Sequence, residues 1–408
     1  MYRIRLIGLV LGALWASSAA AQGSPQPIVE LTYDSALALA REQAPALEAA
    51  RARAREADRR VDAAAVWRFN PELSGAVGPR TGADGTTVDW SVGAQQWLEL
   101  GGQRGDRVEA ARAHAAAGAA RSADTHRLLL REVSLAFIAA LYWQRRVALA
   151  DEHLVLAEAV ARVATRRHEV GDAGGLERSV AALAVVRART DADRSRASRT
   201  QAEGRLKALL GIEASATLAC RGDLRRLGEP AQAEPDSSDR PDVQALRADI
   251  RQAEAEAALG RAGRVPNLAL GAGYAREESA DIVTGTLTIS LPVFDHGQGT
   301  TVVAEARRQR LQSELDVTTS TAAVEADTAR ATAERLSAAA RRFEREGLQT
   351  LERSEELATA SYEAGAIPLG ELLALRRELV QAKLDYADLL LGAARARVEL
   401  AASTGALR

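Results

Sequence analysis

Cysteine, aromatic residues and long apolar runs are all scarce in this chain of 408 residues. The single cysteine, Cys220, cannot form a disulfide within the chain, and it fits no zinc or redox spacing. No stretch reaches the ~18 uninterrupted apolar residues that cross a bilayer, which excludes a protein built from membrane-spanning helices. Aromatic residues make up 4%, too few to fill a compact core easily, whereas long helices with narrow seams need few. A formal net charge of −2 gives no support for nucleic-acid binding.

Catalytic and metal-binding patterns are missing as well. The five histidines show no ligand spacing with one another or with Cys220, and the sequence contains neither a GxSxG pattern nor a phosphate-binding loop. The many carboxylates lie among arginines on predicted helices, a pattern typical of solvated, salt-bridged helix faces. We therefore expect no enzyme, no metal site and no cofactor.

The first 21 residues have the pattern of a secretory signal peptide. Arg3 and Arg5 precede an apolar run over 6–15, and three alanines at 19–21 offer a cleavage site before Gln22. The expected new N-terminus has no cysteine, so we expect no lipid anchor. The sequence predicts export, with the mature protein in the periplasm, secreted, or inserted in the outer membrane.

A long internal duplication is the strongest feature that is present. Three pairs of segments repeat after about 195 positions: NPELSGAVG (70–78) and VPNLALGAG (265–273), WLELGGQR (97–104) and PVFDHGQG (292–299), RHEVGDAGGLE (167–177) and SYEAGAIPLGE (361–371). This period is far longer than the 20–50 residues of a solenoid repeat. We interpret residues 22–211 and 241–408 as two structural repeats, joined by an irregular connector over 212–240.

Each repeat is predicted to contain a helix, a β-hairpin and a long helical hairpin. The expected ranges are 31–65, about 71–97 and about 103–211 in the first repeat, and 241–263, about 266–292 and about 300–404 in the second. No proline interrupts 103–169 or 301–362, so each long helix would approach ~100 Å at 1.5 Å per residue. Each then turns back at a glycine, Gly171 or Gly365, for which we expect the positive φ of a helix C-cap.

Both predicted hairpins have one apolar face and one small or polar face. Residues of alternate parity share a face of a strand, and the apolar positions are Val88, Trp90 and Val92 in the first repeat, and Val283, Leu287 and Ile289 in the second. An ordinary half-buried hairpin is the simpler interpretation. However, four strands in two separate hairpins leave open edges and are marginal alone. We therefore predict that the apolar positions face lipid.

Four strands cannot close a membrane barrel, which needs at least about eight. Three chains would supply twelve strands, and the same symmetry would align their helices into a hollow cylinder. The predicted fold is mainly α with a small β part. Long antiparallel coiled-coil hairpins and four strands per chain would form a homotrimer with a twelve-stranded outer-membrane β-barrel, continued by a periplasmic α-helical barrel.

Several segments resemble the TolC-like outer membrane efflux protein family over nearly the whole mature length. They are LTYDSALALAREQAPALEAAR, PELSGAVG, LELGGQR and SYEAGAIPLGELLALRRELVQAKLDY. The resemblance implies a trimeric tunnel in outer-membrane lipid, docked by a periplasmic membrane-fusion adaptor and an inner-membrane pump, here of the RND type. The stretch WLELGGQRGDR is most similar to the CzcC-like subgroup, which serves heavy-metal cation exporters.

The resemblance also implies where the functional residues lie. Residues 362–373 correspond to the family's inner gate, so Tyr362 and Glu371 would contribute to the gate and its selectivity. Three copies of Glu371 around one axis would attract cations; alternatively, this carboxylate only complements the helix dipole after Pro368. The second acidic position of the gate is Ala374 here. The tips expected to contact the adaptor contain His168, Gly171, Asp172, Gly174, Gly365, Ile367 and Pro368.

The sequence leaves several functions open. We expect a passive outer-membrane channel of a tripartite efflux system, conducting heavy-metal cations from periplasm to exterior and gated at the periplasmic tip. A channel for organic toxicants or for type I protein secretion is the alternative within this class. A periplasmic coiled-coil adaptor or scaffold is the alternative of another class.

Overall fold

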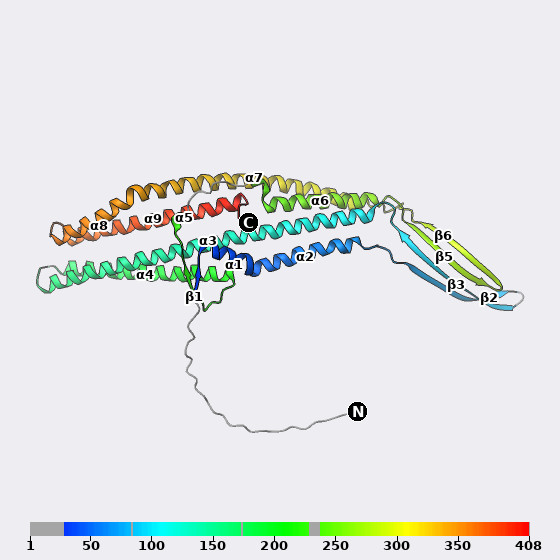
Figure 1. The fold of residues 1–408 in the computed structure, drawn as a ribbon, viewed down its shortest axis with the longest axis horizontal. Coiled ribbons are helices and arrows are strands. Elements are labelled where there is room, and N and C mark those ends of the chain that lie inside the picture. Colours follow the sequence, from blue (N-terminus) through cyan, green and yellow to red (C-terminus); the bar gives the residue numbers. More distant parts are fainter. Residues whose placement is uncertain (1–27, 83–84, 173, 228–236, 408) are drawn as a thin grey trace, which may run out of the picture.

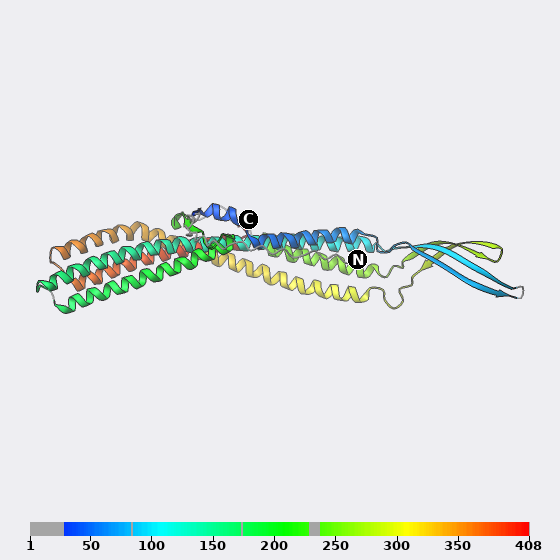
Figure 2. The same cartoon turned by 90° about the horizontal axis from the view of Figure 1, so that it is seen from below.

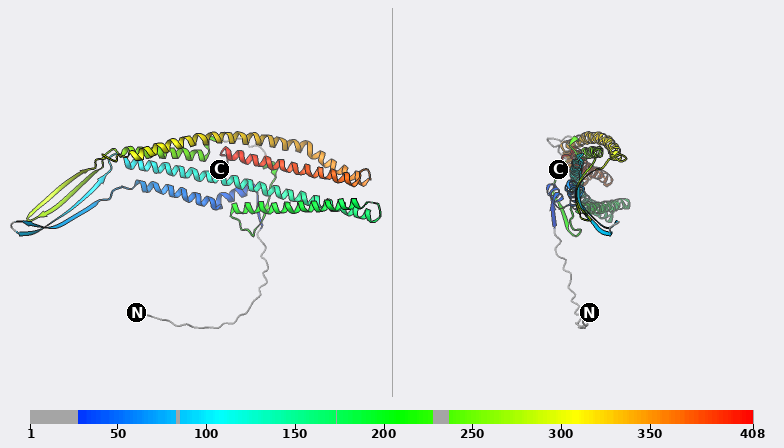
Figure 3. Two further views of the ribbon diagram at one scale, coloured as in Figure 1. Left: turned by 180° about the vertical axis from the view of Figure 1, so that it is seen from behind. Right: turned by 90° about the vertical axis from the view of Figure 1, so that its right-hand side faces the viewer.

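The computed structural model describes residues 28–82, 85–172, 174–227 and 237–407. The expected signal peptide, residues 1–21, lies outside these ranges. The molecule is a long helical body with a four-stranded sheet at one end and two helical turns at the other (Figure 1 and Figure 2). Seen along its length, the described chain bends into an open arc (Figure 3). The C-terminal end of the last helix lies near the middle of the body (Figure 1).

The first repeat has the predicted order. Its elements are α1 (Tyr33–Gln43), α2 (Pro45–Ala65), β2 (Glu72–Gly82), β3 (Gly85–Leu98), α3 (Gln103–Glu169) and α4 (Gly175–Leu210). The Thr32 side chain accepts a hydrogen bond from the Ser35 backbone and completes a capping box for α1. The single helix expected over 31–65 is wrong, because Ala44 takes an extended conformation before Pro45, which starts α2.

The second repeat follows the same order, with a single helix in place of α1 and α2 and with a π-helical turn added. Its elements are α6 (Pro241–Ala262), β5 (Leu268–Glu277), β6 (Ala280–Ile289), α7 (Gln298–Arg342), a π-helical turn (Phe343–Gly347), α8 (Leu348–Glu363) and α9 (Leu369–Ser403). The predicted long helix is therefore interrupted after the 45 residues of α7, with the 16 residues of α8 still to follow, whereas α3 runs for 67 residues without a break.

The described parts of the connector, 212–227 and 237–240, contain more regular structure than expected. They contain β4 (Thr217–Cys220), the short helix α5 (Leu224–Leu227) and a 3₁₀ turn (Ser237–Asp239). β4 pairs in parallel with β1 (Ile28–Leu31), so the described chain has six strands rather than four. The physical reason is burial: Leu218 and Cys220 belong to the main apolar core, which holds the strand in place.

The main core lies at the middle of the helical body. It is built around Phe137 and Ile138 of α3, which are fully buried, and it includes side chains from α1, α4, β4, α5 and α9. Leu130 and Leu206 are also fully buried there. Because most other buried side chains along the helices are alanines, the helices approach closely through narrow seams, as the low aromatic content predicts.

The sheet confirms the predicted hairpins and joins them edge to edge. All neighbours are antiparallel, in the order β2-β3-β5-β6. Residues that lie directly opposite share a face, and the register pairs Val77 with Trp90, Val92 with Tyr274, and Leu270 with Leu287. The alternating pattern of all four strands therefore combines into one apolar face and one face of small and polar residues.

Close glycine packing fixes the junction between the sheet and the second helical hairpin. A Cβ at Gly260, near the end of α6, would lie 2.8 Å from the backbone nitrogen of Thr301 in α7. We expect Gly260→Ala to lower the free energy of unfolding by about 2 kcal/mol through this clash, measured by denaturant unfolding. Gly299→Ala is the control because its Cβ would meet no atom within 4 Å. Equal effects of the two substitutions would contradict the packing argument.

Candidate functional site

The two helical turns lie together at the end of the body farthest from the sheet (Figure 1 and Figure 3). Gly171 and Gly365 have φ values of 81° and 71°, which confirms the expected left-handed caps. Each turn makes the same pair of bonds. In the first, the amides of Asp172 and Gly171 donate to the carbonyls of Arg167 and His168 at 2.8 and 3.0 Å. In the second, the amides of Ala366 and Gly365 donate to the carbonyls of Ser361 and Tyr362 at 2.8 and 3.0 Å. Both repeats therefore end their long helix in a Schellman motif.

An apolar cluster packs the two helical hairpins against each other next to these turns. Its buried members are Val160, Ala164, Ala181, Ala358, Leu369 and Leu372. Tyr362 and Ile367 are partly buried against it. The structure therefore brings these two sequence-predicted residues into contact with the first hairpin. The cluster itself was missed by the sequence analysis, because alanines at helical spacing do not indicate their partner.

Arg167 is the polar centre of the tip, and sequence reasoning did not single it out. Its guanidinium donates to Asp172 at 2.9 Å and to Glu177 at 3.4 Å. The buried Tyr362 hydroxyl lies beside this guanidinium, and no group of the described chain meets it with full hydrogen-bond geometry. Asp172 and then Tyr362 raise the pKa of Arg167 above its ordinary value. The arginine is therefore charged at any physiological pH and joins the first tip to the second.

Glu371 lies in the first turn of α9, and its side chain is exposed. Pro368 is the N-cap residue with an extended backbone, and its carbonyl accepts the Glu371 amide hydrogen bond at 3.1 Å. On the first tip, Gly174 is the N-cap residue of α4 and His168 lies in the last turn of α3. The predicted tip residues are thus gathered at one end of the molecule, although only some of them touch.

The apolar face of the sheet is exposed along its whole width. Val283 is 81% exposed and Leu287 62%, and the other predicted positions, Val88, Trp90, Val92 and Ile289, lie between 43% and 64%. The opposite face presents side chains such as Ser74, Ser91 and Thr286, together with glycines. Near the hairpin tips this polar face carries Arg80, which donates to Asp89 at 2.6 Å and also to Glu277.

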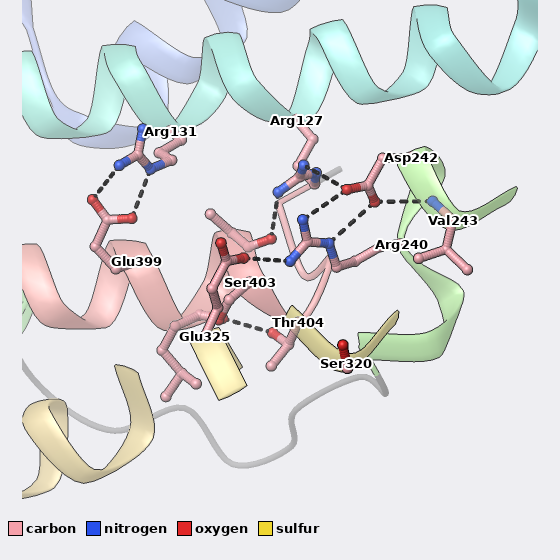
Figure 4. Close-up of polar contacts among 12 residues, drawn as sticks. Arg127, Arg131, Arg240, Asp242, Val243, Ser320, Glu325, Glu399, Ser403 and Thr404 are labelled. Atoms are coloured by element: carbon pink, nitrogen blue, oxygen red, sulfur yellow. Dashed lines mark hydrogen bonds and ion pairs between the residues drawn. The ribbon is translucent and has the colours of Figure 1, made fainter. Parts of the chain in front are cut away.

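A buried charge cluster at mid-length joins the second repeat to α3 (Figure 4). Arg240 donates to Asp242 at 2.7 Å and to Glu325 of α7 at 2.7 Å. Arg127 of α3 donates to the Ala402 carbonyl at 2.8 Å and lies 4.0 Å from Asp242. Both arginines are under 10% exposed. No sequence motif indicated this cluster, because its members are up to 275 positions apart.

Two further observations concern the described residues. Among them, no three histidine, cysteine, aspartate or glutamate side chains are grouped so as to hold a metal ion. No helix in the described ranges combines the length and the apolar character needed to cross a membrane.

Comparison with solved structures identifies the fold. A membrane protein from Pseudomonas aeruginosa matches with a TM-score of 0.75 at 22% identity, over 91% of this chain and 93% of that one. The channel protein CusC matches with a TM-score of 0.76 at 21% identity, over 91% of each chain. These matches cover 91% of this chain and confirm the predicted fold class.

Comparison with characterised sequences identifies the family. The cobalt-zinc-cadmium resistance protein CzcC of Cupriavidus metallidurans is 26% identical over 72% of this chain and 71% of its own length. The nickel-cobalt-cadmium resistance protein NccC of Alcaligenes xylosoxydans is 29% identical over 77% and 72%. The family model for outer membrane efflux proteins matches residues 36–212 and 237–406, one segment in each repeat. The chain therefore belongs to the outer membrane efflux protein family, and it is a passive efflux channel of the outer membrane rather than an enzyme.

Proposed function

We propose that three copies of this chain form the exit channel of a tripartite system that exports heavy-metal cations. Each copy would place its sheet in the outer membrane and its helical body in the periplasm. A periplasmic adaptor would bind the helical tips, and an inner-membrane pump would supply the energy. An N-terminal signal peptide would export the chain.

The exposed apolar face of the sheet carries this proposal. Leu73, Val77 and Val283 are each at least 76% exposed in a single chain. Exposed leucine and valine on the two outer strands of one face, β2 and β6, are costly in water and favourable in lipid. The polar face, with its serines, threonines and glycines, then suits a water-filled lumen. A periplasmic adaptor or scaffold is surrounded by water, where an exposed apolar face of this kind is unfavourable, and this disfavours that alternative.

The arc of the helical body supports a closed ring. One chain curves around only one side of an axis (Figure 3), and its four-stranded sheet has two open edges, β2 and β6. Pairing β6 of one copy with β2 of the next would remove every open edge in a closed set of three. The expected mass of the assembly in detergent is therefore that of a trimer, measured by light scattering.

The metal cargo is inferred from the two resistance proteins above, whose names specify cobalt, zinc, cadmium and nickel. The direct test is resistance: a host that lacks its own channel should grow in cadmium or zinc when this chain is expressed with its cognate adaptor and pump. Restored resistance to organic toxicants alone, or secretion of a polypeptide, would favour the alternative cargoes and contradict the metal assignment.

The gate is proposed at the helical tips. Tyr362 and Arg167 join the two hairpins of one copy, and the exposed Glu371 is available to face the axis. The adaptor contact is proposed at the two turns, which include His168, Gly171, Asp172 and Gly174 of the first repeat and Gly365, Ile367 and Pro368 of the second.

Glu371→Gln tests the charge at the gate. Three carboxylates in a narrow opening focus a field that favours cations, so their removal should lower the cation-to-anion permeability ratio by about tenfold. The measurement is the reversal potential of reconstituted channels in a salt gradient. Glu356→Gln is a matched control, because it removes a carboxylate from α8 outside the gate turn. An unchanged ratio in Glu371→Gln would remove this residue from the filter.

A further inference from the structure

The π-helical turn Phe343–Gly347 distinguishes the second repeat from the first. A π turn inserts one residue into an α-helix, and such turns are frequent at functional sites. Here it separates α7, which packs along α6 and α9, from α8, which leads to the gate turn. The equivalent helix α3 has no such interruption.

Contacts from two other elements hold the turn itself. The Phe343 ring stacks on Tyr386 of α9, with centroids 5.0 Å apart and ring planes at 12°. Glu344 accepts a hydrogen bond at 2.9 Å from Arg225 of the connector. Gly347 makes room for the ring, because a Cβ there would lie 3.0 Å from the Phe343 side chain. The turn is therefore an anchored point rather than a frayed helix end.

Between the anchored turn and the tip, the N-terminal half of α8 borders a cavity of about 1010 Å³ that α3 lines on the other side. The last turns of α8 pack on α3 through the apolar cluster at the tip. The cavity is lined by Leu351 and Glu355 of α8, by Tyr386 and Lys383 of α9, and by Glu152 of α3. Within the described chain the buried Tyr386 hydroxyl has no hydrogen-bond partner. Empty space on one side of a helix leaves it without the contacts that would fix its position.

One cation bridges this cavity. The Lys383 ammonium lies 3.1 Å from Glu152 of α3 and 2.9 Å from Glu355 of α8, and its side chain is 22% exposed. Lys383 therefore holds α8 toward the first helical hairpin at a level between the π turn and the apolar cluster at the tip.

We propose that Phe343–Gly347 is a hinge about which α8 swings, and that Lys383 is the latch that holds α8 in the position seen here. This inference rests on the proposed gate. A rotation of α8 about its N-terminal end, at the π turn, moves Tyr362 and the following turn with it. Release of Glu355 from Lys383 would let α8 move away from α3 and open the tip.

Pulsed EPR distances across the cavity test the hinge in the full-length protein, reconstituted with excess unlabelled chain. Spin labels are placed at Val155 of α3 and Leu357 of α8, which are 63% and 59% exposed. The background is Cys220→Ala, so that the native thiol is not labelled. Deletion of Glu346 converts the π turn to an α-helix while the flanking helices stay in phase. We expect the distance distribution to become about twofold narrower.

The latch is tested by Lys383→Met, which keeps the length of the side chain and removes its charge. We expect the distribution to shift to longer distances and to broaden about twofold. Glu352→Gln is the matched control, since Glu352 lines the same cavity without pairing to Lys383, and it should leave the distribution unchanged.

An unchanged distribution after deletion of Glu346, or a Lys383→Met result equal to the control, would overturn the proposal. If the Glu346 deletion variant does not fold, the result for Lys383→Met by itself supports or overturns the proposal. These distances do not depend on transport, so the two proposals can fail separately. If the distances change as expected but the chain confers no metal resistance, the proposed cargo is wrong and the hinge is still supported.

Discussion

Leu287→Arg should prevent stable insertion of this protein into the outer membrane. Leu287 lies on the apolar face of the sheet, opposite Leu270, and is 62% exposed in the single chain. An arginine on the lipid face of a barrel costs about 3 kcal/mol per chain near the middle of the bilayer, and a ring of three would incur this cost three times. The measurement is the amount of folded, heat-modifiable protein in isolated outer membranes, together with urea unfolding in liposomes.

Thr286→Arg is the matched control, one residue earlier on the same strand. Its side chain points to the opposite face, where we propose a water-filled lumen, so the folded protein should remain abundant. The two substitutions add the same charge and volume at nearly the same depth. Loss of insertion in both, or in neither, would show that the two faces of the sheet do not differ in environment as we propose.

Asp242→Asn should cause the largest loss of stability within the helical body. Asp242 accepts hydrogen bonds from Arg240 at 2.7 and 3.1 Å and lies 4.0 Å from Arg127. Both guanidiniums are nearly inaccessible to water. Removing the charge would break the two charge-assisted hydrogen bonds from Arg240 in a site with little water, at a cost of about 3 kcal/mol. Arg240 would keep Glu325 as its counter-ion and Arg127 would keep Asp124. Thermal unfolding in detergent should show a midpoint lower by several degrees.

The pH dependence of this variant should also differ from that of the wild type. Burial alone would raise the pKa of Asp242, but the hydrogen bonds and charges of Arg240 and Arg127 together lower it. A lowered folded-state pKa contributes stability above the unfolded value of about 4, and this is lost as pH falls through the folded value. The stability gap between wild type and Asp242→Asn should therefore shrink under acid conditions.

Asp62→Asn is the control for the charge cluster. Asp62 pairs with Arg59 at 3.3 Å, and both side chains are more than 70% exposed. A pair in water contributes little, so the change should stay below about 0.5 kcal/mol. If Asp62→Asn and Asp242→Asn destabilise the protein equally, burial is not what makes the cluster important.

The sequence predicted those features that depend on local chemistry. The two hairpins, the parity of Val88 and Val283, and the left-handed glycines Gly171 and Gly365 all follow from alternation or from turn chemistry, and the structure places them as expected. The break at Ala44 was missed although Pro45 stands beside it, because the first helix was extended through a proline that in fact begins a new one.

What could not be predicted depends on contacts between distant segments. Arg127 meets the carbonyl of Ala402 from 275 positions away, and no spacing in the sequence indicates that pairing. Arg167 is one of many arginines on these helices, and only the meeting of the two tips distinguishes it. The π turn was missed for a related reason, because Phe343 is stabilised by stacking on Tyr386 rather than by local propensity.

The pairing of β1 with β4 has a consequence for biogenesis. Ile28, near the start of the described chain, lies opposite Thr217 in the connector, with the whole first repeat between them. A chain that crosses the inner membrane from its N-terminus must therefore keep this short strand unpaired until about 190 further residues have been translocated. The parallel pair is thus a late, long-range contact, and it ties completion of the first repeat to arrival of the connector.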